Sequence, residues 1–198
     1  MGVLVVSKLY FYYSAMNAGK SSLLLQLSST YIEKGMFIIL FTPLITYTKR
    51  GYSVNSRVGI SSYAVPVDNV LSIYTYVIKA LRYRKDNLVC VFVDEVHLLT
   101  QENVFDLIKI VDILNIPVRA FGLRSDFAGK LFGGSILLLL YGDELVEVSS
   151  ICQCGRKATM TIRFSKKGNR IYKGKQIVIG GNTMYMSICR KHFFSSFF

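Results

Sequence analysis

The chain has 198 residues, enough for one sizeable hydrophobic core with a small appendage but too few for two full domains. Hydrophobic residues make up 52% of it and charged residues 18%, a composition that excludes disorder and predicts a buried, globular interior. The formal net charge is +12, but the 24 Lys and Arg residues form no dense block. Charge alone therefore does not predict nucleic-acid binding, and we expect no nucleic-acid partner.

No segment predicts a membrane span or a targeting signal. The apolar run "SILLLLY" at 135–141 is far shorter than the roughly 20 residues that a membrane helix needs, and we expect it in the core. The apolar start of the chain has no basic region before it, and Val6 stands where a myristoylation signal needs Ser or Thr. We expect a cytoplasmic protein with no membrane partner.

The first elements in chain order are a strand, a loop and a helix. Residues 8–13 are rich in β-forming residues, 14–20 form a loop, and 21–35 have a helical apolar pattern that ends at Gly35. A continuous apolar strand follows over 36–43 and stops at Pro43. The segment 44–70 has weak periodicity, which indicates a loop-rich region close to the site.

The second half continues the alternation of strands and helices. Residues 88–95, "LVCVFVDE", predict a strand ending in two carboxylates, and an amphipathic helix over 103–115 precedes a short strand over 116–123. This order predicts an α/β fold with a parallel sheet covered by helices on both faces. We expect a core domain over 1–150 and a small C-terminal element over 151–198, with a hairpin-like loop at 164–175.

The loop before the first helix fits the phosphate-binding pattern G-x-x-x-x-G-K-[ST] at all but one position, because Ser14 replaces the first glycine. A helix N-terminus stabilises phosphate through its unpaired amides and its dipole. The lysine can reach the β and γ phosphates, and the following hydroxyl can ligate Mg²⁺. A glycine turn with a solvated lysine is the alternative, but the flanking strand and helix favour ATP binding. The expected ATP-binding residues of the loop are Ser14, Ala15, Met16, Asn17, Ala18, Gly19, Lys20 and Ser21.

Asp94 and Glu95 follow the third strand, at the sheet edge where the phosphate loop is expected. In this position Asp94 would assist the Mg²⁺ ion, and Glu95 would take a proton from a water or a substrate hydroxyl. Residue chemistry leaves open which of these acceptors is used. For Glu95 the alternative is a helix N-cap, which involves no catalysis.

Three of the four cysteines predict a metal site. Cys152, Cys154, Cys189 and His192 supply four soft or borderline ligands in two tight pairs, which fits a closed, structural, tetrahedral Zn²⁺ site. The alternative is a set of reduced surface thiols with an unrelated histidine. Cys90 lies inside an apolar strand and is expected to be a small buried residue. Zinc would staple the glycine-bearing segment 155–188, including Tyr185, as a lid over a small acceptor.

Several segments together resemble the type II thymidine kinases, the bacterial family with a P-loop and zinc: "YFYYSAMNAGKSS", "VFVDE", "FGLRSDFAGKLFGGS", "ICQCGRKATM" and "VIGGNTMYMSICRKH". The resemblance covers residues 8–193, and bacterial members also carry Ser at the first loop position. It implies transfer of the γ-phosphate of ATP to the 5′-hydroxyl of thymidine, in nucleotide salvage for DNA synthesis, with Glu95 as the base. It also implies a homotetramer. The residues implied for the thymidine pocket are Met16, Leu123, Phe127, Phe132, Thr161 and Tyr185. The resemblance also implies that main-chain groups around Val178 and Gly180 recognise the edge of the thymine base.

The chain departs from the family pattern in two places. An acidic and Arg-containing run is replaced by Thr46, Tyr47 and Thr48, and Arg50 or Arg57 could compensate, so we expect reduced rather than absent activity. The usual D-E-x-Q-F reads D-E-V-H-L, and we expect His97 to pack or support rather than carry a proton. Two other functions stay open at this point. One is a catalytically weakened nucleotide-binding homologue, and the other is a P-loop ATPase that acts on nucleic acid.

Overall fold

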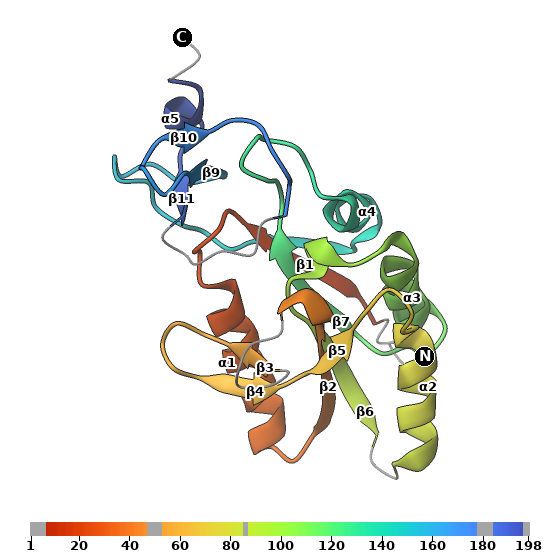
Figure 1. Ribbon diagram of the computed structural model, residues 1–198. Coiled ribbons are helices and arrows are strands. Elements are labelled where there is room, and N and C mark those ends of the chain that lie inside the picture. Colours follow the sequence, from red (N-terminus) through yellow and green to blue (C-terminus); the bar gives the residue numbers. More distant parts are fainter. Residues whose placement is uncertain (1–6, 47–52, 85–86, 178–183, 196–198) are drawn as a thin grey trace.

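The computed structural model describes residues 7–46, 53–84, 87–177 and 184–195, and Figure 1 shows its arrangement. A six-stranded sheet with strand order β5-β2-β6-β7-β1-β8 forms the main body, and every strand pair in it is parallel. Its strands are β1 (Leu9–Ser14), β2 (Phe37–Pro43), β5 (Val65–Val67), β6 (Leu88–Val93), β7 (Val118–Leu123) and β8 (Glu144–Glu147). The prediction of an α/β fold with a parallel sheet is confirmed.

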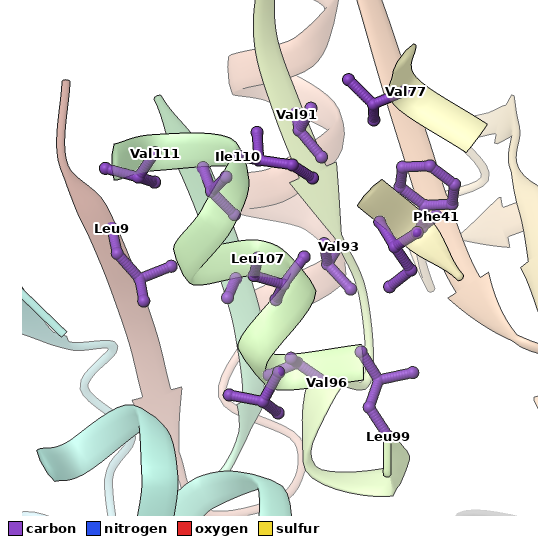
Figure 2. Packing of buried hydrophobic residues seen from close by; sticks show 14 of the residues in the cluster. Leu9, Phe41, Val77, Val91, Val93, Val96, Leu99, Leu107, Ile110 and Val111 are labelled. Carbon is purple, nitrogen blue, oxygen red and sulfur yellow. The ribbon is translucent and has the colours of Figure 1, made fainter. Parts of the chain in front are cut away.

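Helices cover both faces of this sheet. On one face α2 (Ile73–Tyr83), α3 (Gln101–Asp112) and α4 (Gly133–Tyr141) bury a core that includes Leu107, Ile110 and Val93 (Figure 2). On the other face α1 (Lys20–Glu33) packs with the short hairpin of β3 (Ser53–Asn55) and β4 (Ser61–Tyr63). Two 3₁₀ turns, η1 (Leu44–Thr46) and η2 (Val96–Leu98), follow β2 and β6. Both turns therefore begin at the carboxyl edge of the sheet, where ligands bind in such folds.

A small antiparallel sheet follows the main one in sequence, with strand order β10-β9-β11. It consists of β9 (Met160–Phe164), β10 (Arg170–Ile171) and β11 (Tyr185–Ile188), and α5 (Arg190–Phe194) follows it. The predicted hairpin is confirmed, because Phe164 pairs with Arg170 around a turn that contains Gly168 in a left-handed conformation. A boundary between separate domains at residue 150 stays a prediction.

Two expectations need correction, and one helix was missed. The segment 44–70 is not only loop, because it contributes β5 to the main sheet and the β3–β4 hairpin. Helix α2 was not predicted at all. The run 135–141 is only partly core, because Leu138 is fully buried whereas Leu140 is 67% exposed on the outer face of α4. No helix in the described ranges is long and apolar enough to cross a membrane.

Candidate active site

The phosphate loop lies between β1 and α1. Ser14 is the last residue of β1 and pairs in register with Leu123 of β7, so its backbone has the extended conformation that any residue adopts. This explains why serine can replace the first glycine of the pattern. Gly19 is different, because its φ of 82° lies in the left-handed region that favours glycine, while a side chain there would meet nothing within 4 Å.

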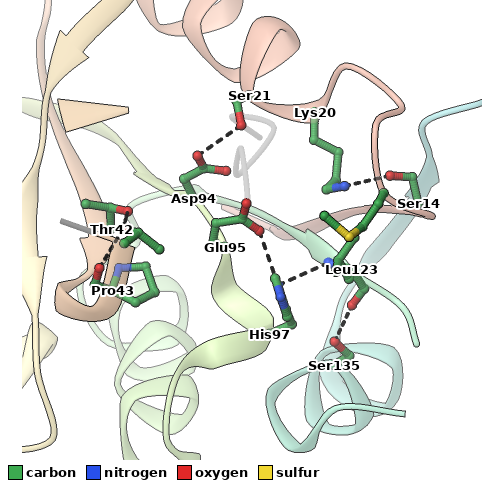
Figure 3. Close-up of polar contacts among 12 residues, drawn as sticks. Ser14, Lys20, Ser21, Thr42, Pro43, Asp94, Glu95, His97, Leu123 and Ser135 are labelled. Carbon is green, nitrogen blue, oxygen red and sulfur yellow. Dashed lines mark hydrogen bonds and ion pairs between the residues drawn. The ribbon is translucent and has the colours of Figure 1, made fainter. Parts of the chain in front are cut away.

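Lys20 is buried under this loop. Its Nζ donates to Ser14 Oγ at 2.8 Å and to the Ala15 carbonyl at 3.2 Å, as Figure 3 shows for Ser14. Burial lowers the pKa of Lys20, and the charges of Glu95 and Asp94 oppose that shift. An ammonium group has three donors, so a third hydrogen can be offered to a phosphate oxygen.

Asp94 lies directly after β6 and faces the first turn of α1. Ser21 Oγ donates to Asp94 Oδ2 at 3.1 Å, whereas Oδ1 is buried without a hydrogen-bond partner among the described residues. Burial, and next the neighbouring charge of Glu95, raise the pKa of Asp94. A hydroxyl beside a carboxylate with an unsatisfied oxygen is a donor set that suits Mg²⁺, and a bound cation would favour the ionised carboxylate.

Glu95 has a left-handed backbone with φ 46°, which is uncommon for a residue other than glycine. It stands at the N-cap position of η2, yet its side chain makes no capping hydrogen bond. The Glu95 side chain therefore does not cap this turn, contrary to the alternative interpretation. Glu95 instead lines a cavity beside the phosphate loop, and its side chain keeps 36% exposure.

His97 packs beside Glu95, against Leu123 and Phe132. Its Nδ1 accepts a hydrogen bond from the Leu123 amide at 3.2 Å and lies 3.4 Å from Glu95 Oε2 (Figure 3). The ring contacts Phe132 edge-on, with 4.5 Å between centroids. Burial lowers the pKa of His97 to about 4, so the imidazole is neutral at pH 7 and the contact with Glu95 is not an ion pair. This geometry agrees with the expected supporting role.

A cavity of about 560 Å³ joins these groups, a size typical of small-molecule sites. The loop residues from Met16 to Ser21 line it together with Glu95. All described residues of the implied thymidine pocket line it as well: Met16, Leu123, Phe127, Phe132, Thr161 and Tyr185. Val178 and Gly180 lie outside the described residues, but the preceding Gln176 and Ile177 reach the cavity. Ser14, Ala15 and Asp94 do not line it and lie behind its wall.

Other lining residues were not among the predicted ATP-binding and thymidine-binding residues. Several come from the segment after β2, including Thr46, Asn55 and Arg57. The Arg57 guanidinium donates to Asn17 Oδ1, which places a positive charge beside the phosphate loop. Its position fits the expectation that Arg57 could compensate for the altered run, whereas Arg50, Tyr47 and Thr48 lie outside the described residues. The position of 44–70 close to the site, and the importance of Thr46 and Arg57 in it, were thus predicted, whereas the contribution of Asn55 was not.

The four predicted zinc ligands converge beside the small sheet. The ligand atoms of Cys152, Cys154, Cys189 and His192 all lie within 4.8 Å of one another. Cys154 Sγ is 3.8 Å from Cys189 Sγ, and Cys152 Sγ is 3.3 Å from His192 Nδ1. Tetrahedral zinc with Zn–S bonds of about 2.3 Å places its sulfur ligands about 3.8 Å apart, so the donor set fits this metal. Cys90 is buried and lies apart from the cluster, as expected.

A family model and a set of curated relatives agree on one family. The family model described as thymidine kinase matches residues 7–193. A thymidine kinase of Legionella pneumophila is 46% identical over 188 residues, covering 95% of this chain and 90% of that protein. Thymidine kinases of Yersinia pseudotuberculosis and Blochmanniella floridana are 45% and 44% identical, each over 95% of this chain and over 95% and 97% of their own lengths.

Proposed function

Because this chain belongs to the thymidine kinase family, and transfers the γ-phosphate of ATP to the 5′-hydroxyl of thymidine, we propose that the cavity between the phosphate loop and η2 carries out the reaction. The observation that carries the proposal is the position of Glu95, which faces the same cavity as Lys20 and the apolar residues Phe127 and Phe132. The named relatives favour a kinase over a nucleotide-binding remnant or a nucleic-acid ATPase.

In this proposal ATP binds with its phosphates against the loop from Ser14 to Ser21, and the free hydrogen of the Lys20 ammonium contacts them. Ser21 and Asp94 would hold Mg²⁺, which neutralises phosphate charge when bound. Arg57, tethered to Asn17, adds a second cation at the mouth of the loop. These groups align the γ-phosphoryl group and lower its charge.

Thymidine takes the apolar part of the cavity, between Phe127, Phe132 and Leu123, with Thr161 and Tyr185 at its side. Glu95 accepts the proton of the 5′-hydroxyl, the hydroxyl oxygen forms the new P–O bond, and the bond between the γ-phosphorus and its bridging oxygen breaks to release ADP. His97 holds the Leu123 amide and stays neutral beside the base.

Three further properties belong to the proposal. Zn²⁺ bound by the three cysteines and His192 stabilises the small sheet. The protein functions in the cytoplasm. It assembles as a homotetramer, in line with the sequence resemblance. The small sheet carries Thr161 and Tyr185, so we expect it to close over the nucleoside.

The test is ATP-dependent phosphate transfer by zinc-replete protein, with thymidine, other deoxynucleosides or no acceptor. We expect thymidine monophosphate from the parent and a fall in kcat of at least about 100-fold in Glu95→Gln, because general-base catalysis contributes on the order of 10²–10⁴. Glu102→Gln is the matched control, since Glu102 is an exposed residue in the first turn of α3.

Retention of the parental kcat in Glu95→Gln would remove Glu95 from its role as base. ATP binding without product from any nucleoside would instead mean that the chain is a nucleotide-binding protein.

A further inference from the structure

The backbone of Met16, in the middle of the phosphate loop, is held from outside the loop. Its N–H donates to Thr161 Oγ1 at 3.1 Å, and its carbonyl accepts a hydrogen bond from Ser187 Oγ. Thr161 lies on β9 and Ser187 on β11. Both partners therefore belong to the small sheet, far from the loop in sequence.

The two side chains act as a pair because their strands are paired. Ser187 and Thr161 are register partners in the β9–β11 ladder, so their side chains project from the same face of the small sheet. Thr161 is 2% exposed, which shields its hydrogen bond from water. One residue further along, Asn17 Nδ2 approaches the Tyr185 carbonyl at 3.5 Å.

The hydrogen bonds to Met16 determine the directions in which the backbone N–H groups of the phosphate loop point. Asn17 and Gly19 both have left-handed backbones, so the loop has no repeating structure to supply partners for its polar groups. The Met16 N–H points to Thr161 and is not available to a phosphate. Fixing both polar groups of Met16 therefore fixes the direction of the amides that follow it.

The same strands lead directly into the cysteine and histidine cluster. Cys189 follows the last residue of β11, and Ile162 and Ile188 of the small sheet pack with Cys152 and Cys189 in one apolar cluster. Figure 1 shows β9 and β11 beyond the end of β1, on the side where the chain enters α1. A continuous set of contacts thus joins the metal ligands to the phosphate loop.

We propose that Ser187 and Thr161 are positioning residues for ATP, and that the metal-stapled sheet holds the phosphate loop in its binding conformation. This rests on the proposed function, in which that loop binds ATP. Neither hydroxyl need touch the nucleotide. The consequence is that disturbing the small sheet weakens binding of ATP even when thymidine is absent.

The experiment measures the dissociation constant of Mg–ATP by calorimetry, without nucleoside, in zinc-replete protein. We expect Ser187→Ala to raise it about tenfold, the effect of losing one net hydrogen bond. Ser165→Ala is the control, because Ser165 lies next to β9 and uses its hydroxyl locally with Asn169, away from the loop. Thr161→Val should act like Ser187→Ala, and Thr161→Ser should restore parental affinity.

Zinc content and circular dichroism identify variants that fail to fold. If Thr161→Val fails to fold, the conservative Thr161→Ser variant still tests whether a hydroxyl at this position supports ATP binding. A second arm removes zinc, after which Ser187→Ala should weaken ATP binding no further.

Equal ATP dissociation constants for the parent, Ser187→Ala and Thr161→Val would overturn the inference while leaving the kinase intact, provided that the parent still forms thymidine monophosphate. A parent that binds ATP and forms no product would overturn the proposed function alone. A parent that binds no ATP would overturn both.

Discussion

His97 is a buried side chain whose protonation links the stability of the protein to pH. Burial lowers its pKa to about 4 in the native state, whereas an unfolded chain has the ordinary histidine value of about 6.5. As the pH falls through that interval, the unfolded state binds a proton before the folded state does. The free energy of unfolding therefore decreases, by at most about 1.4 kcal/mol per pH unit.

We predict that His97→Gln makes the free energy of unfolding less dependent on pH between about 6.5 and 4. Urea unfolding of the parent and the variant at pH 7 and pH 5 measures this, and the parent should lose more stability between the two. His192 is present in both proteins, so its contribution cancels in the comparison. The same loss in both proteins would show that His97 is not the responsible group.

Close packing of α4 and β7 against η2 fixes the turn that directly follows Glu95. A Cβ atom added to Gly134 would lie 2.7 Å from the Val96 carbonyl oxygen, and one added to Gly122 would lie 2.9 Å from Val96 Cγ1. At such distances the Val96 carbonyl oxygen, a backbone atom, and the Val96 side chain must both move. Since Val96 directly follows Glu95, a movement of η2 also displaces the proposed base.

We predict that Gly134→Ala lowers both stability, by about 1–3 kcal/mol, and kcat for thymidine. Gly133→Ala is a matched control in the same first turn of α4, because a side chain there meets nothing within 4 Å. Urea unfolding and the rate of thymidine monophosphate formation measure the two effects. Similar behaviour of both variants would show that η2 tolerates the contact.

The elements that were predicted correctly carry their signal locally. Strands β2 and β6 are buried in a parallel sheet and read as continuous apolar runs, and the phosphate loop and the carboxylates after β6 are short contiguous patterns. Strand β5 has only three residues and pairs with the last three of β2, too short for any periodic pattern. Its formation depends on β2, which is a tertiary effect.

The exposed face of α4 and several contacts in the site likewise have no local signal in the sequence. An unbroken apolar run cannot reveal which helix face meets the core, so the exposure of Leu140 was not foreseen. The contacts of Met16 with Ser187, and of Asn17 with Arg57, join segments far apart in the chain. No local pattern could have indicated them. The convergence of Cys152, Cys154, Cys189 and His192 could be predicted because their spacing in the sequence is itself the signal.

For the molecule as a whole, metal removal is the most informative perturbation. The ligand cluster packs with the small sheet, which contributes Thr161 and Tyr185 to the cavity. We predict that chelating zinc loosens this sheet and raises the thymidine dissociation constant, measured by calorimetry on protein verified as zinc-free. An unchanged constant would refute the proposed lid.

Thiol reactivity serves as the control for folding in that experiment. Burial raises the pKa of Cys90 to about 12, so its thiol should not react while the main sheet is intact. Of the four cysteines, the three proposed zinc ligands should become reactive after chelation, and Cys90 should react only in urea.

The order of strands in the main sheet also bears on how the protein is made. Strand β1 is synthesised first but lies between β7 and β8, so Leu9 finds its register partner only at Val118 and Tyr10 finds its second partner at Glu144. A nascent chain must keep this apolar strand unpaired until most of the polypeptide has left the ribosome. The phosphate loop attached to it therefore forms late in synthesis, and until then the unpaired strand leaves apolar surface open to non-native association.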